Sequence, residues 1–318
     1  MKTTLGIAFL LAFLATASAA TLPDGVTTRD VWFYSEGVKC YGKLFLPKDF
    51  AADGKSRAVI LAPGWGETAA STEKYAANFA GKGLAAMAID YRGWGKSGGY
   101  VYLAENVRYD DRLRFSQHTA KVRIRRKRLI PDDQVSDIRN AISFLQGEPG
   151  VDRLHIGVWG ADMAGGHVMV IAGLDPRVKA VVAQVPIIEG KNAERKLSLP
   201  KPGSKQADIQ QVEVNLARTG EAPATPVAAV AMNAEETKIA LAEYHPFWFV
   251  SQIPEKTAVL FVVAANDTKV KNEDNAIAAA KVLKGPNSVT TVPGAHAVAG
   301  KASDQAADAA GEWFVKYL

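Results

Sequence analysis

The amino-acid sequence predicts an α/β fold in which helices cover both faces of a mainly parallel β-sheet. Runs of strand length at residues 57–61, 84–89, 178–185 and 258–264 are almost wholly apolar, which is typical of strands buried on both faces. Stretches of helical periodicity, about ten to fifteen residues long, separate such runs. The 318 residues, 48% of them hydrophobic, suit one large domain with insertions better than two equal halves.

A hairpin opens this domain and strand–helix pairs follow. Runs rich in β-forming residues at 26–34 and 39–46 flank the turn signal Ser35-Glu36-Gly37. The strand at 57–61 leads through Ala62-Pro63-Gly64-Trp65-Gly66-Glu67 into a helix that carries Tyr75 and Phe79 and ends near Gly81.

The strand at 84–89 runs into Asp90-Tyr91-Arg92-Gly93-Trp94-Gly95-Lys96-Ser97-Gly98. The Gly95-Lys96-Ser97 triplet resembles part of a phosphate-binding loop. That interpretation fails, because Asp90 stands where the motif requires glycine and no helical pattern begins at Lys96.

The second half continues the alternation. Pro131 opens a helix that ends at Gly147, and the elements that follow are a strand near 154–160, a helix stopped by Asp175-Pro176, strands at 178–185, 258–264 and 289–292, and a last helix at 305–318. The pattern lapses at about 187–254, where only 208–217 and 235–244 look helical. We interpret this region as a cap or excursion over the strand ends.

The net charge of +5 is unevenly placed. Between Arg112 and Pro131 the chain carries basic residues and no acidic ones: Arg112, Arg114, Lys121, Arg123, Arg125, Arg126, Lys127 and Arg128. Such a segment would attract an anionic substrate, a phospholipid surface or nucleic acid. We interpret the basic insertion, at about 100–130, as a solvated lid or loop. No nucleic acid is expected as a partner, since no aromatic residues alternate with the charges at 121–128 as a stacking platform requires.

The N-terminus has the composition of a secretory signal peptide. Lys2 supplies a positive start, residues 5–15 are apolar, and Ala17-Ser18-Ala19 is a small-residue cleavage site, so residues 1–20 are expected to be removed and 21–318 to form the mature domain. We therefore expect a periplasmic or secreted protein. No second apolar run has the length of a membrane span, so no stable membrane insertion is expected. The one cysteine, Cys40, is expected to be a half-buried strand residue that forms no internal disulfide.

The stretch at 154–167 has the outline of a nucleophile elbow. An apolar run breaks at Gly160, one residue is held on a tight turn, and Ala164, Gly165 and Gly166 let a helix begin against the strand. The usual form of this motif is G-x-S-x-G. Here Asp162 stands in place of the serine, and Ala164 stands in place of the second glycine.

With these motifs the sequence resembles an α/β-hydrolase, similar to bacterial dienelactone-hydrolase-like and acyl-esterase-like proteins. The motifs that carry the resemblance are Pro63-Gly64-Trp65-Gly66, the segments 90–97 and 159–166, Ala265-Asn266-Asp267 and Pro293-Gly294-Ala295-His296. They cover nearly all of the mature chain. The resemblance implies an eight-stranded sheet with a small cap insertion.

The family's order of nucleophile, acid and histidine implies Asp162, Asp267 and His296 as catalytic residues. Its oxyanion hole implies the backbone N–H groups of Trp65 and Met163 as donors. No pair of His or Cys residues has metal-ligand spacing, so neither a metal nor another cofactor is expected. The expected partner is a small-molecule substrate. The positive charge of the basic insertion is compatible with an anionic one.

Asp at position 162 decides the chemistry that the sequence predicts. A carboxylate is already ionised at neutral pH, and its attack on saturated carbon that bears halide, or on an epoxide, gives an alkyl ester that an activated water can hydrolyse. Haloalkane dehalogenases and epoxide hydrolases, relatives in this fold, work in this way. This chain differs from both, with Met163 where dehalogenases have Trp and with Tyr244 as the one tyrosine between 187 and 254.

Three interpretations follow. The chain is an active hydrolase of an ester-like or alkyl-electrophile substrate, with Asp162 as nucleophile or as a base that orients water. Alternatively, it is a catalytically silent protein of this fold that binds a ligand or partner. In the third interpretation, the basic insertion binds nucleic acid or a membrane surface.

Overall fold

An eight-stranded β-sheet forms the centre of the computed structural model, which describes residues 22–188, 214, 217–218 and 235–318. Across the sheet the strands are β1 (Thr27–Ser35), β2 (Val38–Leu46), β4 (Ala85–Ile89), β3 (Ser56–Ala62), β7 (Val151–Ala161), β8 (Val178–Gln184), β9 (Ala258–Ala264) and β10 (Asn287–Val292). The β1–β2 and β2–β4 pairs are antiparallel and all other pairs are parallel. The predicted mainly parallel, eight-stranded sheet is confirmed.

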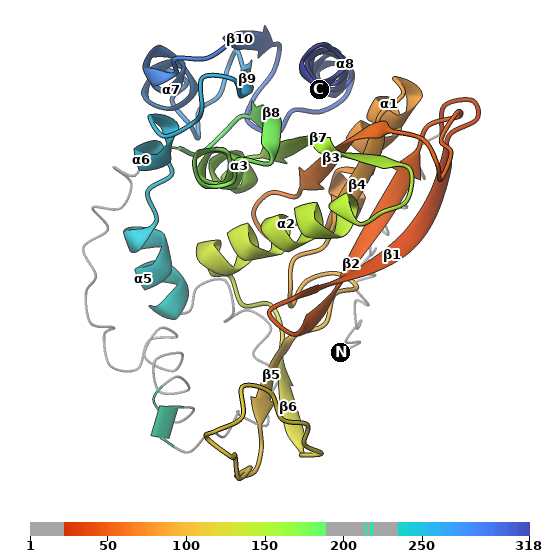
Figure 1. Ribbon diagram of the computed structural model, residues 1–318. Coiled ribbons are helices and arrows are strands. Elements are labelled where there is room, and N and C mark those ends of the chain that lie inside the picture. Colours follow the sequence, from red (N-terminus) through yellow and green to blue (C-terminus); the bar gives the residue numbers. More distant parts are fainter. Residues whose placement is uncertain (1–21, 189–213, 215–216, 219–234) are drawn as a thin grey trace, which may run out of the picture.

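Helices cover both faces of this sheet, as predicted (Figure 1). The helices α1 (Glu73–Gly81) and α8 (Lys301–Tyr317) pack on one face, and α2 (Pro131–Gln146), α3 (Met163–Leu174), α6 (Phe247–Val250) and α7 (Ala278–Val282) pack on the other. The short helices η1 (Ala69–Ser71) and η3 (Glu273–Ile277) precede α1 and α7, and α5 (Glu235–Glu243) lies before α6. Two apolar clusters, one on each face, make up the core. Every residue of β9 is buried, and its inner five residues alternate between the two clusters.

A network around Asp90 fixes the loop after β4. The carboxylate of Asp90 accepts hydrogen bonds from the backbone N–H groups of Ala69 and Lys96, each at 2.7 Å, and the Ser97 hydroxyl donates to the Asp90 carbonyl oxygen. The Gly95-Lys96-Ser97 triplet is therefore part of a structural turn. Because Ala69 follows the loop after β3, this turn also anchors the segment that carries Trp65.

The structure corrects three expectations. Cys40 is fully buried in β2 rather than half-buried, and burial raises the pKa of its thiol to about 12. The basic insertion is not simply a solvated loop, because β5 (Tyr100–Leu103) and β6 (Val122–Arg125) pair as an antiparallel hairpin within it. The last helix also begins four residues before the predicted start, at Lys301.

The predicted signal peptide and most of the predicted cap lie outside the described residues. Of the two helices expected in the cap, the second corresponds to α5, whereas 208–217 falls almost wholly outside the described part of the chain. Among the described residues, no helix is long and apolar enough to cross a bilayer.

Candidate active site

Asp162 lies at the tip of a strained bend between β7 and α3. Its φ of 54° and ψ of −119° fall in a region that costs a non-glycine residue about 1–3 kcal/mol. The bend is held from outside: the Asp162 N–H donates to the Gln184 carbonyl oxygen, and the Asp162 carbonyl oxygen accepts from the N–H of Ile187, both at 3.0 Å. A Cβ at Gly160 would clash with the carbonyl oxygen of Ala164. The small residues of the elbow are therefore a steric requirement.

The three residues that the sequence nominates as catalytic lie in one hydrogen-bonded row. His296 follows β10, and its Nε2 is 2.8 Å from Asp162 Oδ1 while its Nδ1 is 2.7 Å from Asp267 Oδ2. Asp267 follows β9, and its side chain is fully buried. The other Asp267 oxygen accepts the backbone N–H groups of Lys269 and Val270, each at 2.9 Å, which fixes the carboxylate that orients the imidazole.

The second oxygen of Asp162 lies where the predicted oxyanion hole should be. Asp162 Oδ2 accepts the backbone N–H of Trp65 at 3.1 Å, and the backbone N–H of Met163 also donates to this carboxylate. Gly64 makes the approach possible, since its missing Cβ would lie 3.3 Å from the Cβ of Asp162. The structure thus brings both nominated donors to one carboxylate, and that carboxylate bridges the imidazole and the backbone donors.

Hydrogen bonding sets the charge state of this row. Burial alone would raise the pKa of Asp162, but the hydrogen bonds from His296, Trp65 and Met163 together outweigh burial and lower it. The hydrogen bond to Asp162, aided by Asp267, raises the pKa of His296 despite its partial burial. Both shifts favour the ion pair, in which the imidazolium form of His296 donates one N–H to each of two carboxylates.

A cavity of about 570 Å³ opens beside Asp162 and His296. Its lining combines the ring pair Tyr75 and Trp159, whose centroids are 4.6 Å apart, with the charged side chains of Glu67 and Lys269. Glu67 accepts hydrogen bonds from the Gly64 N–H at 3.2 Å and the Ser71 hydroxyl at 3.0 Å, so it braces the loop that carries Trp65. The volume suits a small molecule.

Sequence reasoning missed Glu67, Tyr75 and Lys269 as site residues. Glu67 and Tyr75 stood in segments that were recognised only as loop and helix, and Lys269 belongs to no motif. The one available signal was proximity in sequence to Trp65 and Asp267.

A second buried histidine lies on α3, close to the elbow. His167 Nε2 is 2.9 Å from Gln134 Oε1 and its Nδ1 is 2.6 Å from the Tyr244 hydroxyl. Burial lowers the pKa of His167 to about 3, so the ring is neutral, donating to Gln134 and accepting from Tyr244. These contacts make His167 a packing residue, and Tyr244, whose hydroxyl is engaged here, is half-buried and does not line the cavity beside Asp162.

Within the described part of the chain, no group of three or more His, Cys, Asp or Glu side chains is arranged to hold a metal ion.

Comparisons with known proteins bear on the family and the fold. The family model described as "Serine aminopeptidase, S33" matches residues 54–269. The quorum-quenching protein AidA of Acinetobacter baumannii is 28% identical over 162 residues, 51% of this chain and 44% of that protein. The thiohydrolase apmlB of Arthrinium phaeospermum is 29% identical over 138 residues, 43% of this chain and 37% of that protein. The matched stretch is thus less than half the length of either curated relative.

Among solved structures, a hypothetical protein of Pseudomonas aeruginosa, PA2218, is similar in fold, with a TM-score of 0.71 and 19% identity over 99% of this chain and 100% of that one. Together with the family match, this similarity confirms the predicted fold.

Proposed function

Because this chain belongs to the serine aminopeptidase S33 family of α/β-hydrolases, we propose that it is a hydrolase in which Asp162 replaces the usual serine nucleophile and forms a covalent ester with a small alkyl electrophile. The observation that carries the proposal is the placement of the Asp162 carboxylate, with Oδ1 on His296 and Oδ2 on the Trp65 N–H. A carboxylate held in this way is ionised without the help of a base. Its second oxygen already lies among the donors that a tetrahedral intermediate needs.

The chemistry favours attack on saturated carbon. A carboxylate that attacked an ester or amide carbonyl would form an anhydride, which is energetically unattractive. Attack of Asp162 Oδ1 on a carbon that bears halide, or on an epoxide carbon, instead forms an alkyl ester while the carbon–halogen or ring carbon–oxygen bond breaks. In the epoxide reaction the released oxygen takes the proton from His296 Nε2; in the halide reaction the halide leaves with the electron pair and His296 releases its proton to solvent.

Esterification also converts His296 from an acid into a base. The negative charge of Asp162 raises the pKa of His296 in the free protein, and forming the ester removes that charge. Neutral His296 then takes a proton from water, whose oxygen attacks Cγ of Asp162, and the oxyanion forms at Oδ2 beside Trp65 and Met163. Collapse breaks the bond between Cγ and Oδ1 and releases the alcohol, which takes the proton from His296. The carboxylic acid that is left ionises and restores the ion pair.

A decisive test combines mass spectrometry with labelled water. The His296→Ala variant, exposed to short haloalkanes, halo-acids, epoxides and acyl esters, should accumulate an adduct on the peptide that contains Asp162, and the His296→Ala/Asp162→Asn double variant should not. In a single turnover in H₂¹⁸O, the native protein should place the label in Asp162 and not in the product. Label in the product alone would assign Asp162 the role of a base that orients water, and turnover that survives Asp162→Ala would exclude both roles.

One observation favours a second candidate function, that of a silent ligand-binding protein. The Asp162 carboxylate fills the oxyanion hole and pairs with His296, so the groups that would serve an ester carbonyl are already occupied. In that case no substrate class is turned over by the native protein, whereas Asp162→Ser gains esterase activity. The Arthrinium relative is named a thiohydrolase, so a thioester belongs among the substrates offered to both forms.

We also propose that the protein is exported, on the basis of the residues at 1–20. Expression of the full chain in a bacterium, followed by fractionation and mass measurement, should yield a periplasmic or secreted protein that begins near residue 20. An unprocessed cytoplasmic chain would contradict this proposal.

A further inference from the structure

The β5–β6 hairpin presents its apolar side to solvent. Val101 pairs with Ile124 and Leu103 pairs with Val122, so the four side chains share one face of the hairpin, and all four are exposed. In a hairpin that packed against the hydrophobic core, such an apolar face would point inward. In Figure 1 this hairpin projects from the body of the protein, away from α8 and β10.

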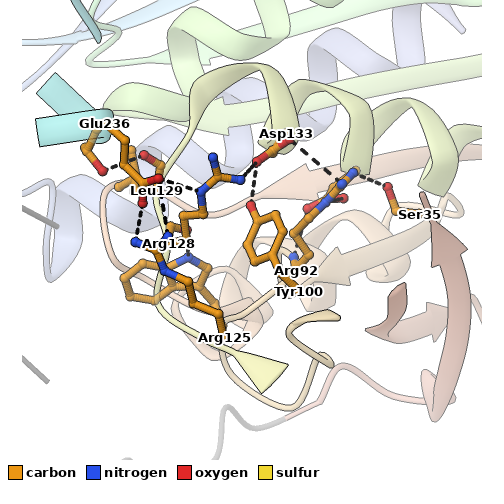
Figure 2. Close-up of polar contacts among 11 residues, drawn as sticks. Ser35, Arg92, Tyr100, Arg125, Arg128, Leu129, Asp133 and Glu236 are labelled. Atoms are coloured by element: carbon orange, nitrogen blue, oxygen red, sulfur yellow. Dashed lines mark hydrogen bonds and ion pairs between the residues drawn. The ribbon is translucent and has the colours of Figure 1, made fainter. Parts of the chain in front are cut away.

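Ion pairs on the opposite face fix this orientation. Figure 2 shows Arg125 and Arg128 reaching Glu236 of α5, with Arg128 also 3.4 Å from Asp133 of α2. The Tyr100 hydroxyl donates to Asp133 at 2.6 Å, beneath the Arg128 guanidinium. A slip of one residue in the chain would turn Tyr100 and Arg125 outward and break these contacts. The exposed aliphatic face is therefore held in place by half-buried polar groups.

The loop that joins the two strands adds exposed rings and positive charge on the same arm. Phe115 is 93% exposed, and Tyr109 and Leu113 are also largely exposed. Residues 100–128 carry nine Arg and Lys residues against three acidic ones. Among the described residues, several of these cations have no ion-pair partner; they are Arg108, Arg114, Lys121 and Lys127.

We propose that this hairpin arm, residues 100–127, docks the protein on an anionic lipid surface. Exposed aliphatic and aromatic side chains beside unpaired cations match a bilayer boundary, where apolar groups enter the acyl region and cations meet phosphate. A second copy of the chain fits less well, because two arms of the same positive charge repel. Nucleic acid would pair with the cations and the rings of the loop but offers no apolar partner for the aliphatic face of β5 and β6. This inference does not depend on the chemistry at Asp162.

Vesicle binding tests the proposal. The protein should sediment with vesicles of phosphatidylglycerol and phosphatidylcholine, and not with phosphatidylcholine alone, and added salt should weaken the binding. Arg114→Gln should weaken it about fivefold, the change expected for one cation near an anionic surface, and Leu113→Ser should also weaken it. Arg153→Gln and Leu154→Ser are the matched controls. Both residues are exposed, lie near the start of β7 and are not part of the hairpin arm, so these variants should bind as the native protein does.

A fluorescent label separates docking on lipid from the alternatives. Because Cys40 is buried, a single added cysteine takes the label: with an environment-sensitive dye, Phe115→Cys should shift to the blue on anionic vesicles, and Leu154→Cys should not. Absence of binding to anionic vesicles overturns the proposal, as does binding that the Arg114 and Leu113 variants leave unchanged. Sedimentation of the native protein as a dimer that Leu113→Ser dissociates would assign the arm to a second copy. Binding of a random DNA duplex that Arg114→Gln weakens, without vesicle binding, would assign it to nucleic acid.

Discussion

The pKa values of two buried histidines near the elbow are shifted in opposite directions. His296 contacts two carboxylates, and they raise its pKa, whereas His167 contacts a phenol and an amide, and its burial lowers its pKa to about 3. The comparison shows that partner identity sets the charge of an imidazole that burial alone would neutralise. At His296 the ring is prepared to exchange protons, and at His167 it is a fixed part of the packing.

Replacing Asp162 by Asn should have the largest effect. The substitution removes the proposed nucleophile and one of the two negative charges beside His296, so turnover should fall on the order of 10⁴-fold or more. The pKa of His296 should drop, whereas His167, whose pKa burial already lowers against the charge of Asp162, should stay neutral. Turnover measurements and ¹⁵N chemical shifts of the imidazole nitrogens across a pH series check this. An unchanged His296 titration would mean that Asp162 does not hold its charge.

The Asp267→Asn substitution should lower turnover by about 10³-fold, because an amide can hold the imidazole in the wrong tautomer and no longer stabilises the imidazolium. The fall should be steepest in hydrolysis of the ester intermediate, where His296 acts as a base. Rapid-quench kinetics on the substrate identified by adduct formation separates the two steps, and the exposed Asp274→Asn serves as the control. Equal slowing of both steps would argue against the separate roles assigned to Asp162 and His296.

The two histidines should give opposite dependences of stability on pH. The raised pKa of His296 contributes stability that is fully present below about pH 6.5 and is lost as pH rises through the folded-state value. The lowered pKa of His167 contributes stability above about pH 6.5 that is lost as pH falls, by about 1.4 kcal/mol per pH unit.

Urea unfolding of His167→Gln between pH 7 and pH 4 should therefore show a shallower loss of stability than the native protein shows, with the exposed His118→Gln as the control. Parallel curves for native protein and His167→Gln would mean that His167 is protonated in the folded state.

The smallest effect is expected from Tyr244→Phe. Removing the hydroxyl leaves Nδ1 of His167 without a donor, which should cost about 1–2 kcal/mol of unfolding free energy. Turnover should stay within about twofold, because neither residue contacts the reacting groups in the proposed mechanism. Thermal unfolding and initial rates test both statements, with the exposed Tyr34→Phe as the control. A large loss of turnover would give His167 a part in positioning the elbow.

The sequence could predict those parts of the site that local motifs encode. Gly160, Asp162 and Ala164 describe one bend, and Asp267 and His296 each follow a strand, so the order of nucleophile, acid and histidine implied by the resemblance to α/β-hydrolases was enough to nominate them together. The mainly parallel sheet was predictable because apolar runs mark its most deeply buried strands, and its eight strands were implied by the resemblance.

The remaining features depend on side chains that meet across long stretches of sequence. Arg128 contacts Glu236, which lies 108 residues away, and His167 contacts Tyr244, which lies 77 residues away. No periodicity carries that information. The sequence also could not predict the exposed face of the hairpin arm. Aliphatic residues alternate along both strands, and pattern rules assume that the aliphatic side of such a strand is buried. In this hairpin that side is exposed.

The bend at position 162 has one more consequence, for protein engineering. Its backbone is fastened by the Gln184 carbonyl and the Ile187 amide, and neither contact involves the side chain that the bend displays. Any short polar residue can therefore be installed there without rebuilding the scaffold. A single codon change at this position is enough to compare carboxylate, hydroxyl and thiol reactivity within one and the same framework.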